Sequence, residues 1–227
     1  MQAALTSFQQ EIARIDKVAD WLTSPAALTP DMVQATWAMR CGAVVLFSGY
    51  LESFIKGCMC AFIMKVNALG HPLTKLPADM KHTHFRLGAK ALEWQYKMDK
   101  RNGDTTKCEN LAARLASVSA ATGYTLAWEA FANTQSNPSP FVVGALLSGV
   151  GVKKPWPKLK AATPPGLVDL NTFLTSFIIM RNECAHSGNT TSPPGAADLL
   201  QYGQNLSGLG TAMVVVLTHR LTEIATL

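Results

Sequence analysis

Apolar residues recur at helical spacing near the start of the chain. Phe8, Ile12, Ile15, Val18 and Trp21 follow one another at steps of three or four, which is the period of one helical face. This spacing predicts a helix that starts at Thr6 or Ser7 and runs to Thr23. Ser24-Pro25 then breaks the pattern.

A second, longer helix is predicted from Thr29-Pro30-Asp31 to about Ala68. These three residues form a strong helix start, with a capping hydroxyl, a proline at the first position and an acid in the first turn. The segment is apolar on nearly all sides, which is typical of a helix in a core or at an interface. Glu52 and Lys56 are spaced for an ion pair across one turn. A surface ion pair and a functional carboxylate therefore both remain open for Glu52.

The remaining pattern is also helical, and strand-like alternation is almost absent, so we predict an all-α fold. Three glycines in the last helix, Gly203, Gly208 and Gly210, predict close helix packing. Loops or turns are expected at 71–79, 99–104, 122–140 and 189–194. Further helices are expected at 81–97, 105–121, 140–150 and 196–225.

Composition adds three expectations. A length of 227 residues fits a single domain, residues 1–227. With 48% hydrophobic and 15% charged residues, we expect a buried surface beyond the core of one protomer, such as a dimer interface. The net charge of +5 permits nucleic-acid binding without requiring it.

Cysteine usage and the apolar segments predict a cytoplasmic protein that does not enter a membrane. The five cysteines, an odd number without a CxxC pair, fit reduced structural thiols. The first residues lack the apolar core of a signal peptide. The longest apolar stretch, residues 41–64, is interrupted by Glu52 and Lys56.

A group of polar side chains stands at the end of the helix predicted from Asp169 to Gly188. Leu170, Leu174 and Phe177 form an apolar row, and Arg181 takes its next place. Asn182 and His186 share a neighbouring row at i, i+4 spacing. Cations at a helix C-terminus are favoured by the helix dipole, so a purely structural role is one interpretation.

The same three residue types suit metal-independent cleavage of RNA. Histidine titrates near neutrality and can move a proton. Arginine carries a permanent charge and a fork of donors that matches phosphate oxygens. Asn182 can orient either group. Arg181 and His186 are five residues apart and so point about 140° apart around the helix. The two side chains of one protomer therefore do not both reach the same substrate atom.

The string Arg181, Asn182, Ala185, His186, Gly188 resembles the R-N-x-x-A-H-x-G signature of the HEPN superfamily. Tyr50-Leu51-Glu52 is similar to an acidic position in the RiboL-PSP branch of that superfamily. The segment from Ser136 to Val152 and the polar loop before the motif helix also resemble this branch.

The resemblance implies a multi-helix bundle with long central helices that dimerises across the motif helix, so that two motifs face one cleft. It implies a metal-independent endoribonuclease, a toxin or anti-phage effector, that leaves a cyclic phosphate and a 5′-hydroxyl. Its catalytic residues would be Arg181, Asn182 and His186, with Glu52 holding Arg181 or His186. It needs no cofactor and no metal. RNA, a second copy and an antitoxin or other regulatory protein are the implied partners.

Two other functions remain open. One is a non-catalytic HEPN module that binds RNA, a nucleotide or a partner protein. The other is a helical adaptor with no role in nucleic-acid binding, which the apolar composition favours.

A basic segment is the last candidate. It is predicted to be a linker whose four lysines contact an RNA backbone around a stacking tryptophan, or else a solvated loop with one anchoring tryptophan. Its residues are Lys153, Lys154, Trp156, Lys158 and Lys160.

Overall fold

A computed structural model describes residues 1–24, 29–116, 125–134, 137–187 and 192–227. Within these residues the chain forms α-helices and short 3-10 helices and no strand, which confirms the predicted all-α class. In chain order the elements are α1 (Gln2–Leu22), η1 (Pro30–Met32), α2 (Val33–Ala68), η2 (Leu73–Lys75), α3 (Ala78–Asn102), α4 (Thr106–Ala116), η4 (Trp128–Ala130), α5 (Pro140–Gly149), α6 (Pro155–Ala162), α7 (Leu170–Ser187) and α8 (Ala196–Ala225).

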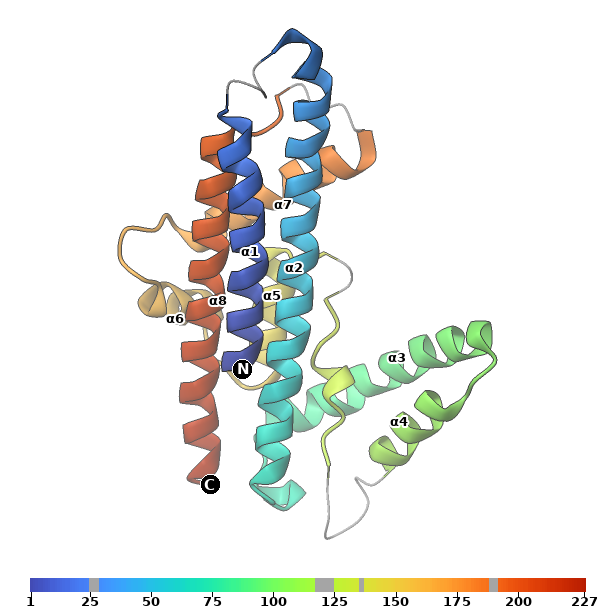
Figure 1. The fold of residues 1–227 in the computed structure, drawn as a ribbon. Helices are drawn as coiled ribbons and strands as arrows, with labels where there is room; N and C mark the ends of the chain where they lie inside the picture. The colour runs from blue at the N-terminus through green and yellow to red at the C-terminus, as the bar shows by residue number, and fades with distance from the viewer. Residues whose placement is uncertain (25–28, 117–124, 135–136, 188–191) are drawn as a thin grey trace.

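Three long helices, α1, α2 and α8, stand side by side and form the body of the bundle (Figure 1). Of the predicted apolar row of α1, Phe8, Ile12 and Ile15 are buried in this body, whereas Val18 is half-buried and Trp21 is exposed. The helix starts at Gln2, earlier than the pattern indicated. Helix α2 buries residues on several of its sides because α1, α7 and α8 all pack against it. Its nearly uniform apolar composition follows from this central position.

Two glycines allow α8 to approach α1 closely. A Cβ atom added at Gly203 would lie 2.9 Å from Asp16 Oδ1 and 3.0 Å from Ile12 Cγ2. One added at Gly210 would lie 3.0 Å from Leu5 Cδ1. The predicted reason for glycine in α8, close helix packing, is confirmed for Gly203 and Gly210, whereas Gly208 faces Leu167 in the loop between α6 and α7.

Helix α7 crosses behind α1 and α2 in Figure 1 and packs against α2 and α8. Its predicted apolar row is buried: Leu170, Leu174 and Phe177 belong to the core. Burial of this row fixes the rotation of α7 about its own axis. It thereby also determines the direction in which the polar residues at the end of α7 point. The predicted terminal glycine, Gly188, lies outside the described residues.

Helices α3 and α4 form an arm that extends from the bundle (Figure 1). The prediction of a polar turn from Asp99 was wrong, because α3 continues to Asn102 and ends at Gly103, whose φ is 69°. Asp99 is buried inside the arm, where its Oδ2 accepts a hydrogen bond from the backbone of Cys108 at 2.7 Å. The carboxylate thereby satisfies a backbone donor in the first turn of α4. Residues 117–124, where α4 was predicted to end, lie outside the described part.

The basic segment is not the predicted linker. Residues Pro155–Ala162 form α6, which packs against α8. Pro155 stands at the first helical position, where its missing N–H costs nothing, and Leu159 is buried. These two features outweighed the run of lysines that suggested a solvated loop. The predicted polar stretch before α5 is confirmed as a loop with the short η4 inside it, for the residues described there.

Of the helices in the described ranges, α2 alone is long and apolar enough to cross a membrane by length and composition. Its most apolar window has a mean hydropathy of 1.3, and 50% of that window is buried inside the protein. Such burial is what a central helix of a bundle requires.

Candidate functional site

The polar group at the end of α7 lies on one uninterrupted helix. Arg181 Nη1 donates a hydrogen bond to Asn182 Oδ1 at 3.0 Å, and both side chains are half-buried. His186 is exposed in the last turn. Along the row of Ile178, Asn182 and His186, exposure therefore rises from the core to the solvent.

Glu52 lies on α2, the helix against which α7 packs. Its Oε1 accepts hydrogen bonds from Lys56 Nζ at 2.6 Å and from Thr134 Oγ1 at 2.7 Å. Burial by itself raises the pKa of Glu52, but these two bonds and the positive charges of Lys56 and Arg181 outweigh it, and the pKa lies below its usual value. Glu52 is therefore a carboxylate at neutral pH.

Arg181 is close enough to Glu52 for the two charges to interact. The hydrogen bonds of Glu52 go to Lys56 and Thr134, and a weaker charge interaction links it to Arg181, so the sequence prediction that Glu52 holds Arg181 or His186 stays a prediction. The Nε of Arg181 is buried without a hydrogen-bond partner. The guanidinium thus keeps donor capacity beyond its bond to Asn182.

Thr134 was missed by the sequence analysis. It lies in the loop between η4 and α5 and is fully buried. A threonine in a polar loop carries no local signal that sets it apart, because its partner lies on a helix far earlier in the chain. The resemblance of the neighbouring segment from Ser136 onward was the nearest available hint.

Cys184 stands inside the motif, between Arg181 and His186, and is buried. Burial, together with the hydrogen bond and charge of its neighbour Cys41, raises the pKa of its thiol to about 12. A thiol protonated this firmly is a poor nucleophile. Cys184 acts as a packing residue between α7 and α2, in agreement with the structural role predicted for the cysteines.

The lysines of the basic segment lie apart from the residues that surround Glu52. Lys153 Nζ bonds to Asp79 Oδ2 at 2.6 Å, and Lys154 precedes α6 with a φ of 51°. Lys158 and Lys160 are exposed on α6. In Figure 1, α6 lies beside α8, on the opposite side of the bundle from the α3–α4 arm.

Trp156 has an anchoring position. Its Nε1 donates to the backbone oxygen of Pro140 at 3.1 Å, and its half-buried ring packs against the core. Of the two interpretations of this segment, the geometry favours the anchoring tryptophan over the stacking one. A contact of the lysines with RNA stays a prediction.

No group of three or more side chains suited to hold a metal ion occurs within the described residues. Two histidines on α3, His82 and His84, were a weak metal-site candidate by sequence and lie in different environments. His82 is exposed, whereas His84 is fully buried and its Nδ1 accepts the backbone N–H of Ala127 at 3.3 Å.

Comparison with known proteins gives one match. A family model described as RiboL-PSP-HEPN matches residues 12–218, which includes α2, the loop of Thr134 and the whole of α7. No curated protein and no solved structure matches the chain.

Proposed function

The chain belongs to the RiboL-PSP branch of the HEPN family, and from this premise we propose that it is a metal-independent endoribonuclease. The proposed active site consists of Arg181, Asn182 and His186 on α7, with Glu52 on α2. One observation carries the proposal above all: Arg181 is hydrogen-bonded to Asn182 and interacts with the charge of Glu52, while His186 on the same helix end is open to solvent.

The proposed reaction is attack of a ribose 2′-oxygen on the neighbouring phosphorus. One imidazole takes the proton of the 2′-hydroxyl, the bond from the 2′-oxygen to phosphorus forms, and the bond from phosphorus to the 5′-oxygen breaks. A proton delivered to the 5′-oxygen completes the step, so the products are a cyclic phosphate and a 5′-hydroxyl. His186 has the residue type for the proton transfers.

Arg181 is proposed to stabilise the charge that builds up on the phosphate. Its bond to Asn182 supports this role, because a donor held in place before the reaction needs no reorganisation. Asn182 and Glu52 are then positioning residues: Asn182 accepts from Arg181, and Glu52 offers an opposite charge close to it.

A second copy of the chain is part of the proposal. In one protomer Arg181 and His186 point about 140° apart around α7, so one motif does not place both side chains against the same phosphate. Ile179 lies seven residues before His186, on the same side of the helix, and 56% of its side chain is exposed. An exposed apolar residue two turns before His186, on the same side of α7, supports pairing of two α7 helices, which would bring two arginines and two histidines to one phosphate.

The biological setting is proposed on the family alone. A cytoplasmic toxin or anti-phage effector, restrained by an antitoxin or another regulatory protein, is the role that we infer for a ribonuclease of this family.

A second candidate is a non-catalytic HEPN module that binds RNA, a nucleotide or a partner protein. The observation in its favour is that the hydrogen bonds of Glu52 go to Lys56 and Thr134. With Glu52 engaged in this way, Arg181 and Glu52 could serve the structure of the bundle.

The test is cleavage of a mixed RNA pool in the presence of EDTA by the wild type, His186→Ala and Arg181→Ala. We expect the wild type to cut and both variants to lose at least a hundredfold in rate, as is typical when a charge-stabilising donor is removed, about 10²–10³-fold. His219→Ala is the matched control, because His219 is an exposed histidine on α8 that bonds to Glu223 at 3.1 Å. RNA left intact by the wild type but bound by it would move the second candidate ahead.

A further inference from the structure

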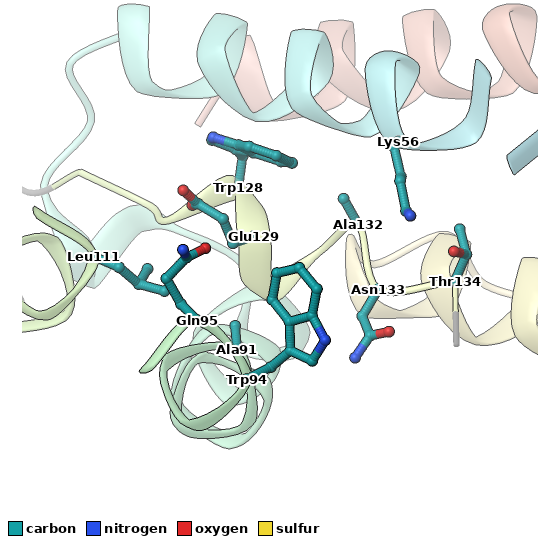
Figure 2. A pocket seen from close by; sticks show the side chains of 10 residues that line it. All are labelled: Lys56, Ala91, Trp94, Gln95, Leu111, Trp128, Glu129, Ala132, Asn133 and Thr134. Atoms are coloured by element: carbon teal, nitrogen blue, oxygen red, sulfur yellow. The ribbon is translucent and has the colours of Figure 1, made fainter. Parts of the chain in front are cut away.

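A cavity of about 240 Å³ lies between α2, the α3–α4 arm and the η4 loop (Figure 2). Two tryptophans line it, Trp94 from α3 and Trp128 from η4. Lys56 extends from α2 toward Ala132 and Thr134 of the loop, as Figure 2 shows. We call this space the Trp94 cavity.

The Trp94 cavity adjoins the proposed active site through two shared residues. Lys56 and Thr134 both line the cavity, and both bond to Oε1 of Glu52. Glu52 in turn interacts with the charge of Arg181. A molecule in the cavity therefore sits one side chain away from the carboxylate that accompanies the motif arginine.

The size and lining of the cavity suit one planar ring. Its volume is just below the range of about 300–1,000 Å³ that is usual for ligand pockets, so a single ring system is a better fit than a larger ligand. Indole faces stack on nucleobases whatever their sequence. Trp94 is 61% exposed, so its ring is accessible to a partner from solution.

Glu129 adds a polar feature. It lines the cavity and is paired with Arg114 through Oε1, and its Oε2 is buried without a hydrogen-bond partner. An ionised carboxylate only accepts hydrogen bonds. Adenine, cytosine and guanine carry an exocyclic amino group that can donate to it, whereas uracil offers only its ring N3–H.

Two basic side chains lie in line with Trp94 along the exposed face of α3, leading away from the Trp94 cavity. Arg86, Lys90 and Trp94 follow at four-residue steps on α3 and are all exposed, so they share one face. Arg86 and Lys90 line a neighbouring cavity of about 170 Å³ together with Phe141, which is 80% exposed. Asn133 lines both cavities. Aromatic rings beside basic side chains form the usual surface for a single strand of nucleic acid.

We propose that the Trp94 cavity holds a base of the RNA strand that is cut, stacked on Trp94, and that the strand continues along Lys90 and Arg86. This inference rests on the proposed function, because it assumes that RNA is the substrate. In this inference the RNA strand binds to the exposed face of α3 and not to the basic segment on α6.

The test compares binding of labelled twelve-nucleotide adenosine and uridine RNA to His186→Ala protein, with and without Trp94→Ala. We expect Trp94→Ala to weaken binding of the adenosine RNA about tenfold or more, and Trp94→Phe, which keeps a stacking ring, to restore most of it. Tyr96→Ala is the control, because Tyr96 is an exposed aromatic on the same helix that does not line the cavity. The adenosine RNA is expected to bind more tightly than the uridine RNA. If the protein with Trp94→Ala binds the adenosine RNA as tightly as the protein that keeps Trp94, the inference is overturned.

Two further arms separate the sources of failure. In otherwise wild-type protein, Trp94→Ala should raise KM for cleavage and leave kcat nearly unchanged. If cleavage depends on His186 but neither KM nor binding responds to Trp94, the inference fails and the proposed function stands. If RNA binding depends on Trp94 while the wild type cuts nothing, the ribonuclease proposal fails and with it the assignment of the cavity to a cut strand, and the cavity is a binding site for RNA that is not cleaved. Free AMP that competes as strongly as the RNA would identify a mononucleotide as the ligand and overturn the assignment to a strand.

Discussion

Thr134 donates its hydroxyl hydrogen to Oε1 of Glu52 at 2.7 Å, a bond between residues 82 positions apart in the chain. It ties the η4–α5 loop to α2, the helix against which the motif helix packs. The carboxylate that it holds interacts with the charge of Arg181, so the bond connects this loop to the motif.

We expect Thr134→Val to destabilise the fold by about 1.5–3 kcal/mol at neutral pH, since the lost bond is made to a charged group. The pKa of Glu52 should rise, because one of the bonds that lowers it is gone. Unfolding in urea and NMR titration of the Glu52 carboxyl carbon measure the two effects. Thr134→Ser, which keeps the hydroxyl, is the control.

The pH dependence of this loss has a defined sign. The folded pKa of Glu52 lies below its usual value of 4.5, so its contribution to stability is present above pH 4.5 and lost as pH falls through the folded pKa. The difference between Thr134→Val and the wild type should therefore shrink below pH 4.5. A difference that stays constant down to acid denaturation would show that the hydroxyl does not act through the carboxylate.

Ile179→Glu is expected to convert a dimer into monomers, because it places two carboxylates where two exposed apolar side chains meet. The rate of RNA cleavage should fall at least a hundredfold in this variant, since Arg181 and His186 of one protomer do not reach the same phosphate. Light scattering coupled to size-exclusion chromatography measures the mass. Val215→Glu is the control, at a 50% exposed apolar position on α8. Monomeric wild type that cleaves RNA would contradict the paired-motif arrangement.

His84 should make the protein sensitive to mild acid. Burial lowers the pKa of this imidazole from 6.5 to about 4, so between these values the unfolded chain binds a proton that the folded protein does not. Stability therefore falls as pH drops from 6.5 to about 4, by roughly 3 kcal/mol in all. Urea unfolding across this range measures the slope, and His84→Gln should remove most of it. His82→Gln, at an exposed position, should leave the slope as in the wild type.

Two glycine-to-alanine changes should have opposite signs. At Gly210 the new Cβ would lie 3.0 Å from Leu5 and 3.2 Å from Phe8, whose ring stacks on Phe54 and cannot easily move, so we expect a loss of about 1–3 kcal/mol. At Gly49, in the interior of α2, a Cβ would meet nothing within 4 Å, and we expect a gain of about 0.8–1 kcal/mol from helix propensity. Thermal unfolding of both variants decides this. Destabilisation by Gly49→Ala would instead indicate that a partner covers that face of α2.

The sequence by itself determined the long helices and the arrangement of groups within one helix. Side chains three and four residues apart share a face in any α-helix, so the buried row of α7 and the spacing of Arg181, Asn182 and His186 follow from the residue order alone. The glycines of α8 were equally readable, because glycine inside a helix is costly unless another helix packs closely against it.

Only the tertiary structure decided which elements meet. The bond from Thr134 to Glu52, the meeting of Trp94 and Trp128 around one cavity, and the anchoring of Trp156 on Pro140 all join residues on different elements. Such contacts depend on the angles and rotations at which helices pack, and these are set by the sum of many weak contacts over the whole core. The local periodicity of a sequence determines which face of a helix is buried. It does not determine which other element packs against that face.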